Sequence, residues 1–161
     1  MPDLLVKLYE LPALGPEQAR LTRAGIKLRP PLAFEKRAVV DWVNREFGGE
    51  WASECEVAFT KQPVGCIIAV QNRKIIGFAC YDVTCKGFFG PMGVTADARG
   101  QGVGRALLLA GLHGLAAMGY AYAIIGGAGP VAFYQKTVGA IEIEGSEPGI
   151  YRDRLVASDP T

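Results

Sequence analysis

Twenty consecutive residues, from Ala106 to Ile125, carry no formally charged side chain. One helix of this length could cross a membrane. Three glycines and a histidine interrupt the run, however, and its Met118-Gly119-Tyr120 junction is typical of a helix end followed by a new element. The run therefore predicts a buried helix over about 104–118, followed by a buried strand within 120–125.

A second strand precedes this helix. The segment "GFFGPMGVT", residues 87–95, has strand character but is interrupted at Gly90-Pro91. Because proline cannot donate a hydrogen bond to a neighbouring strand, we expect a bulge or a splay at that point. A strand, a crossover helix and a buried parallel strand form a right-handed βαβ unit.

The rest of the chain favours helices and antiparallel strands around this unit. Apolar residues recur every three or four positions between Phe34 and Phe47, which predicts an amphipathic helix. The other expected elements are a short helix near 51–59, a hairpin of 64–71 and 74–84 with its turn at Asn72-Arg73, a helix over 130–138, a strand at 140–144, and an edge strand that includes 6–9 and 26–29. The predicted fold class is α+β.

The composition limits the classes of partner. The length of 161 residues predicts one domain over 1–157 and a short carboxy-terminal tail at 158–161. Lysine and arginine (17) nearly balance aspartate and glutamate (16), so the net charge of +1 gives no field that would gather nucleic acid or a membrane surface. No secretory leader is readable, and we expect a cytoplasmic location.

The cysteines and the histidine suggest no metal centre. Cys55, Cys66, Cys80 and Cys85 form no CxxC pair, and His113 is the only histidine. We therefore expect no metal site and no disulfide framework, with reduced cysteines packed as small apolar residues. His113 lies within the apolar helical run and is expected to have a structural role.

The loop before the apolar helix, "ARGQGVGRALL", places three glycines at alternate positions between Arg99 and Arg105. It lacks the Lys-Ser/Thr pair of a Walker loop, and its spacing differs from G-x-G-x-x-G. What remains is a turn of exposed backbone N–H groups at the positive end of a helix dipole, which suits a pyrophosphate. The alternative is a glycine-rich turn that only lets the helix pack closely on the sheet.

Two segments carry a family resemblance. The sequence "VTADARGQGVGRALL" resembles the acyl-CoA-binding motif of GNAT-type N-acetyltransferases, R/Q-x-x-G-x-G/A, through Arg99, Gly102 and Gly104. The later segment "AFYQKTVGA" is similar to a second motif of that superfamily, with Phe133, Tyr134, Lys136 and Gly139 at the matching positions. The resemblance covers about 63–144 and implies a GNAT-like mixed, mostly antiparallel sheet with a splayed central βαβ unit and flanking helices.

The resemblance also implies acetyl-CoA as the co-substrate. Met92 and Val94, with Gly93 between them, would bind the pantetheine arm through the strand backbone. The pyrophosphate would lie in the loop formed by Arg99, Gly100, Gln101, Gly102, Val103, Gly104 and Arg105. Tyr134 would direct its hydroxyl at the thioester sulfur, and a phenol with a pKa of about 10 can give a proton to a departing thiolate.

The resemblance does not supply a general base. Some relatives that acetylate proteins use a glutamate on the strand before the loop, and "GFFGPMGV" contains no acid. The asparagine often found before the tyrosine-bearing helix is replaced by Gly127. Candidate catalytic acids elsewhere are Glu54, beside Trp51 on the short helix, and Asp82 near the end of a strand.

Other polar residues near the carboxy terminus are less specific. Glu142 and Glu144 alternate with isoleucines, so the period of a strand explains them. The segment "SEPGIYRD" has a turn at Pro148-Gly149 that could bring Tyr151 or Arg152 to an acceptor site.

Two functions remain open from the sequence. The first is an enzyme that transfers the acetyl group of acetyl-CoA to an amine of a small molecule, by direct attack in a ternary complex. The second is a weakly catalytic acyl-CoA-binding sensor or interaction module. Tyr134 favours the enzyme, and the missing strand acid keeps the second function open. A homodimer is compatible with either.

Overall fold

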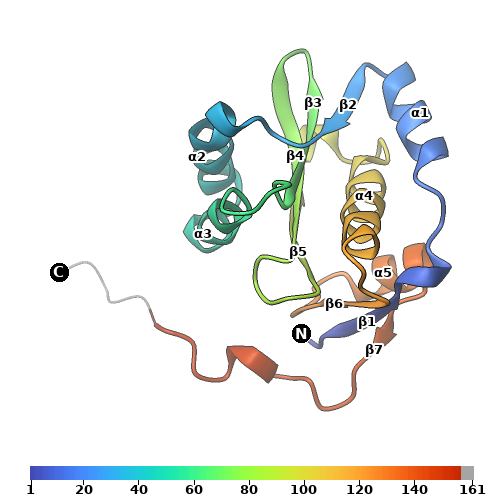
Figure 1. Cartoon of the computed structure of the whole chain (residues 1–161), viewed down its shortest axis with the longest axis vertical. Helices are drawn as coiled ribbons and strands as arrows, with labels where there is room; N and C mark the ends of the chain where they lie inside the picture. Colours follow the sequence, from blue (N-terminus) through green and yellow to red (C-terminus); the bar gives the residue numbers. More distant parts are fainter. Residues whose placement is uncertain (157–161) are drawn as a thin grey trace.

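The computed structural model describes residues 1–156, and the tail expected at 158–161 lies outside this range. A seven-stranded sheet with the order β2-β3-β4-β5-β6-β1-β7 forms the centre of the molecule (Figure 1). Its strands are β1 Leu4–Lys7, β2 Ile26–Arg29, β3 Cys66–Gln71, β4 Lys74–Tyr81, β5 Phe88–Val94, β6 Tyr122–Ile125 and β7 Ile141–Glu142. Among the strands of residues 1–156, only β5 and β6 pair in parallel, which confirms the mixed, mostly antiparallel α+β fold.

Helices cover both faces of the sheet. They are α1 Gly15–Arg23, α2 Lys36–Phe47, α3 Gly49–Ala58, α4 Val103–Ala117 and α5 Val131–Val138, with short 3-10 turns η1 Leu8–Glu10, η2 Ala33–Glu35, η3 Ala96–Ala98 and η4 Gly149–Tyr151. In Figure 1, α2 and α3 lie on one side of β3–β5, and α1 and α4 lie on the other. Each side of the sheet therefore has its own apolar core in the described residues. One lies under α2 and α3, and a larger one surrounds α4.

The apolar run at 106–125 is divided as expected. Helix α4 ends at Ala117, and β6 follows and lies parallel to β5. The helix is apolar on most sides because it packs against β3, β4 and β5 and against α1. Within residues 1–156, no helix combines the length and the hydropathy needed to cross a membrane.

The interruption at Gly90-Pro91 produces the expected bulge and splay. The register between β4 and β5 shifts across it, so that Ala79 opposes Met92 while Tyr81 opposes Phe89. On the other side, β5 pairs with β6 only at Phe88 and Phe89. The second half of β5 therefore has a backbone edge that β6 does not cover.

The amino-terminal strand lies where the sequence did not place it. The prediction of one edge strand from 6–9 and 26–29 is right for β2 but wrong for β1, which lies inside the sheet between β6 and β7. Leu4 and Val6 are fully buried there, and the chain turns into η1 from Leu8. A four-residue apolar strand carries no information about its partners, so its position depends on tertiary packing.

Candidate active site

The glycine-rich loop leads directly into α4. Gly100 and Gly102 both have a φ of +82°, a left-handed conformation that glycine adopts without strain, and Gly102 is the N-cap of the helix. Gly104 lies within the first turn, and a Cβ there would make only ordinary contact with Val94. The first N–H groups of α4 have no intrahelical acceptor, so this turn presents positive potential to an anion.

Two residues of α1, Glu17 and Arg20, lie against the same loop. Arg105 donates from Nε to Glu17 Oε1 at 3.0 Å, and Arg20 donates to the other carboxylate oxygen. The Arg20 guanidinium also lies over Gly102, so closely that any Cβ at that position would overlap it. Glu17 therefore lies between two arginines at the mouth of the loop, an arrangement that the loop motif could not predict because α1 lies some eighty positions earlier.

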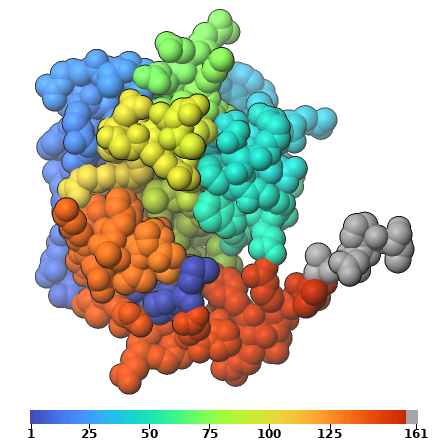
Figure 2. Space-filling view, turned by 180° about the vertical axis from the view of Figure 1, so that it is seen from behind, coloured from blue at the N-terminus to red at the C-terminus, as the bar shows by residue number. Residues whose placement is uncertain are grey.

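A cleft of about 920 Å³ opens where β5 and β6 separate. Its walls come from the bulge of β5, the loop after β6, α5, α3 and the carboxy-terminal segment. In Figure 2, β5 (olive) lies in a recess between α3 (cyan), the glycine-rich loop (yellow) and α5 (orange), with the carboxy-terminal segment (red) along its lower border. Polar and aromatic residues that line it include Glu50, Trp51, Glu54, Thr84, Tyr134 and Tyr151.

Tyr134 lies on α5 and forms part of the cleft wall. Only 7% of the residue is exposed, and its ring packs edge-on against Phe133 with the ring centres 5.3 Å apart. Burial raises the pKa of Tyr134 above its ordinary value, because the phenolate is the form that loses hydration. The hydroxyl therefore keeps its proton at neutral pH and is available as a proton donor.

These features can be compared with known proteins. The model of the acetyltransferase (GNAT) family matches residues 36–140. The chain belongs to this family. Strand β1 and helix α1 lie before the matched residues, so the Glu17–Arg20 pair lies outside the part of the chain that the family model matches.

Solved structures agree with this fold. A GCN5-related glucosamine N-acetyltransferase region of a fungal multi-domain GH3 β-N-acetylglucosaminidase superposes with a TM-score of 0.72 at 16% identity, over 88% of this chain and 19% of that one. A GCN5-related N-acetyltransferase from Sphaerobacter thermophilus gives a TM-score of 0.69 at 20% identity, over 88% and 48%. This chain thus spans about a fifth and about half of those two proteins. Curated proteins yielded no significant match.

The GNAT chain places Glu54, one of the two candidate acids, in the cleft. Glu54 lines it from α3, next to Trp51, and accepts a hydrogen bond from the Thr84 hydroxyl. Tyr151 lies nearby, and its pKa is raised by burial, by Glu54 and by Asp3. Three elements far apart in sequence therefore meet at this wall.

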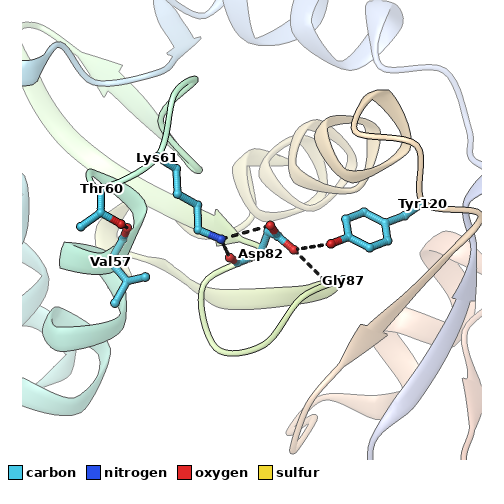
Figure 3. Close-up of polar contacts among 6 residues, drawn as sticks. All are labelled: Val57, Thr60, Lys61, Asp82, Gly87 and Tyr120. Carbon is cyan, nitrogen blue, oxygen red and sulfur yellow. Dashed lines mark hydrogen bonds and ion pairs between the residues drawn. The ribbon is translucent and has the colours of Figure 1, made fainter.

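Asp82, the other candidate acid, is not among the cleft residues. Its carboxylate accepts from the Gly87 N–H at 2.7 Å and from the Tyr120 hydroxyl at 3.0 Å, and it pairs with Lys61 at 3.0 Å (Figure 3). Burial opposes ionisation, but these donors outweigh it and hold the pKa of Asp82 below its usual value. The geometry favours a structural role, closing the loop between β4 and β5, over the role of a base.

The remaining polar candidates lie in different parts of the molecule. His113 contacts the Pro12 carbonyl oxygen at 2.8 Å, which supports the expected structural role. Glu142, Glu144 and Arg152 are exposed and lie outside the cleft, whereas Tyr151 lines it.

The backbone around Gly127, the residue expected to replace an asparagine, is held by local contacts. A Cβ at Gly126 would lie 2.9 Å from the Tyr151 hydroxyl and 3.0 Å from the Phe88 ring. The N–H of Gly127, which has a φ of +53°, donates to Asp3 Oδ1 at 2.8 Å. Tyr151 and Phe88 thus occupy space that a larger side chain at Gly126 would need.

Proposed function

We propose that this GNAT domain transfers the acetyl group of acetyl-CoA to the amine of a small cationic molecule, by direct attack in a ternary complex. The observation that carries the proposal is the position of the buried Tyr134 in a cleft that begins where β5 and β6 separate. A thioester entering between these strands would bring its sulfur toward a protonated phenol.

The donor side would bind coenzyme A through the backbone. The pyrophosphate would accept from the N–H groups of residues 99–105, with Arg20 close enough to add charge. The second half of β5, Met92 to Val94, has an edge free of β6 and would pair with the amide groups of pantetheine. Acetyl-CoA would thereby be held with its phosphates at α4 and its thioester near Tyr134.

The acceptor side favours a cation. Two carboxylates of α3, Glu50 and Glu54, face the cleft together with Trp51, whose ring can bind an ammonium group. Glu54 is our candidate for the general base, because the amine must lose a proton before or during its attack on the carbonyl. No nucleic acid partner is proposed, since the net charge of +1 would gather none.

Residues of this chain can serve each chemical step. Glu54, directly or through a water molecule, takes a proton from the amine, and the nitrogen attacks the thioester carbonyl. Free backbone N–H groups of β5 would stabilise the oxyanion. When the carbon–sulfur bond breaks, Tyr134 donates its proton to the thiolate, and the products are the amide and coenzyme A. Glu54 then releases its proton to solvent, and Tyr134 takes one back from solvent.

One observation favours the second candidate, a coenzyme A sensor without turnover. β5 carries no acid, and Asp82 is bound within its own loop, so Glu54 is the one of the two predicted catalytic acids that lines the cleft. Thiol release from acetyl-CoA over a panel of diamines and amino sugars separates the two functions. Turnover that falls in Tyr134→Phe supports the enzyme. Acetyl-CoA binding without turnover on any amine supports the sensor, and no binding would contradict both.

A further inference from the structure

Three cysteines that are far apart in sequence meet at one point under α3. Cys55 lies on α3, Cys66 on β3 and Cys80 on β4, and their Sγ atoms all lie within 4.8 Å of one another. Cys66 and Cys80 are directly opposed in the β3–β4 register. All three residues are 0% exposed. This cluster is separate from the acetyl-transfer cleft, and none of the three cysteines lines that cleft.

The surroundings of the cluster are apolar. The neighbouring core consists of Val39, Trp42, Val43, Ala52, Ala58, Ile68 and Phe78. Among residues 1–156, no histidine or carboxylate joins the three thiols as a further ligand. Cys85, the fourth cysteine, is half-buried in the loop after β4 and stands apart. The site therefore offers three sulfur ligands and no nitrogen or oxygen ligand from a side chain.

Charge decides which ion such a site can hold. Zinc takes four ligands in closed structural sites, and with three thiolates it would leave a net negative charge in an apolar core. Copper(I), although soft enough for sulfur, would leave a larger negative charge. A trivalent ion bound by three thiolates is neutral, and a pyramidal centre needs no fourth ligand.

We propose that Cys55, Cys66 and Cys80 form a closed binding site for a trivalent thiophilic element of the arsenic and antimony type. With arsenous acid, As(OH)₃, three S–H bonds and three As–O bonds break, and three As–S bonds form. The three protons leave with the three hydroxide groups as water. Arsenic stays trivalent throughout, so no oxidant or reductant takes part.

The exchange begins when one of the three thiols replaces a hydroxide group on arsenic, and the other two thiols then close the site. Because the sulfurs are fully covered, entry requires a local opening of α3, and loading should be slow.

The test uses the whole reduced protein with sodium arsenite in a thiol-free buffer. Native mass spectrometry should show one arsenic gained and three hydrogens lost, with new ultraviolet absorption from the As–S bonds. The unfolding temperature should rise with arsenite concentration, as it does for any ligand that binds only the folded state. Cys85→Ala is the matched control and should behave as the wild type.

Cys66→Ala and Cys55→Ala leave two sulfurs and should bind arsenite at least tenfold more weakly. Circular dichroism without arsenite establishes that these variants fold. If these variants do not fold, arsenite uptake by the wild type still tests the proposal. Failure of the wild type to take up arsenic, uptake that depends on Cys85, or tight stoichiometric binding of zinc in preference to arsenite would overturn the proposal. Acetyl transfer is not measured, so this outcome is independent of the proposed function.

Discussion

The two sides of the cleft are built in different ways. The proposed donor side, from β5 through the glycine-rich loop to α4, β6 and α5, is one continuous stretch of chain that would bind coenzyme A mainly through its backbone. The acceptor side is assembled from side chains of α3, the loop after β4 and the carboxy-terminal segment. A backbone site depends on a few glycines and on one bulge, whereas the side-chain wall can change without disturbing the fold.

The first prediction tests the point where the two sides meet. Tyr134→Phe removes the proton donor and keeps the ring, so we expect kcat to fall by about 10²–10⁴-fold. The affinity for acetyl-CoA should stay within about twofold, because the hydroxyl acts on the departing thiolate. Steady-state thiol release and calorimetric titration measure the two quantities. Phe133→Leu, its neighbour on α5, is the control for altered packing, and an unchanged kcat in Tyr134→Phe would exclude the assigned role.

The second prediction concerns the acceptor wall. Glu54→Gln keeps the shape of the side chain and removes its negative charge, so kcat/KM for a cationic amine should fall by about 10²-fold. Affinity for acetyl-CoA should not change, since Glu54 lies on α3 and the loop leads into α4, on the opposite side of the sheet (Figure 1). Glu50→Gln is the matched control, because Glu50 also lines the cleft but pairs with the exposed Arg154. In this variant kcat/KM for the cationic amine should fall by less than tenfold. Equal losses in both variants would show that α3 supplies only general negative charge.

The third prediction separates two glycines of the donor loop. Gly102→Ala should weaken acetyl-CoA binding by about tenfold or more, because its φ of +82° costs an alanine about 1–2 kcal/mol and Arg20 must move. At Gly104 the backbone is helical and a Cβ would make only an ordinary contact with Val94, so in Gly104→Ala the binding should change little while the stability rises by about 0.5–1 kcal/mol. Titration with acetyl-CoA and thermal unfolding distinguish the two variants. Equal effects would mean that the loop binds no anion through its turn.

The fourth prediction concerns Glu17 and Arg20 of α1. Glu17 has only 15% of its side chain exposed and neutralises both Arg105 and Arg20. Glu17→Gln should therefore strengthen acetyl-CoA binding several-fold and steepen its dependence on salt, whereas Arg20→Gln should weaken it. Dephospho-CoA serves as the second ligand and shows whether the arginines act on the pyrophosphate. Identical affinities in all three proteins would remove α1 from the site.

The same contrast explains how much the sequence could predict. The donor side could be located because a bulge at Gly90-Pro91, alternating glycines and Tyr134 are local signals with direct structural meaning. The acceptor wall, Arg20 and the cysteine cluster could not, since each depends on residues brought together by tertiary packing. Cys66 and Cys80 illustrate this limit of sequence-based prediction. The hairpin that carries them was predicted, but the spacing of residues gives neither its exact register nor the position of Cys55 beside it.

The smallest effect on activity is expected at Asp82, which the sequence offered as a catalytic acid. Asp82→Asn should leave kcat and acetyl-CoA affinity within about twofold, because the residue lies outside the cleft. It should instead lower the free energy of unfolding by about 1–3 kcal/mol, since three donors lose a buried carboxylate.

The pH dependence of this loss has a defined sign. The pKa of Asp82 is depressed in the folded protein, so the carboxylate stabilises the fold above its ordinary pKa and loses this contribution as the pH falls through the folded value. The stability difference between wild type and Asp82→Asn should thus be constant near neutral pH and shrink in acid. Urea unfolding at several pH values measures it. A variant that unfolds like the wild type but loses turnover would return Asp82 to the catalytic machinery.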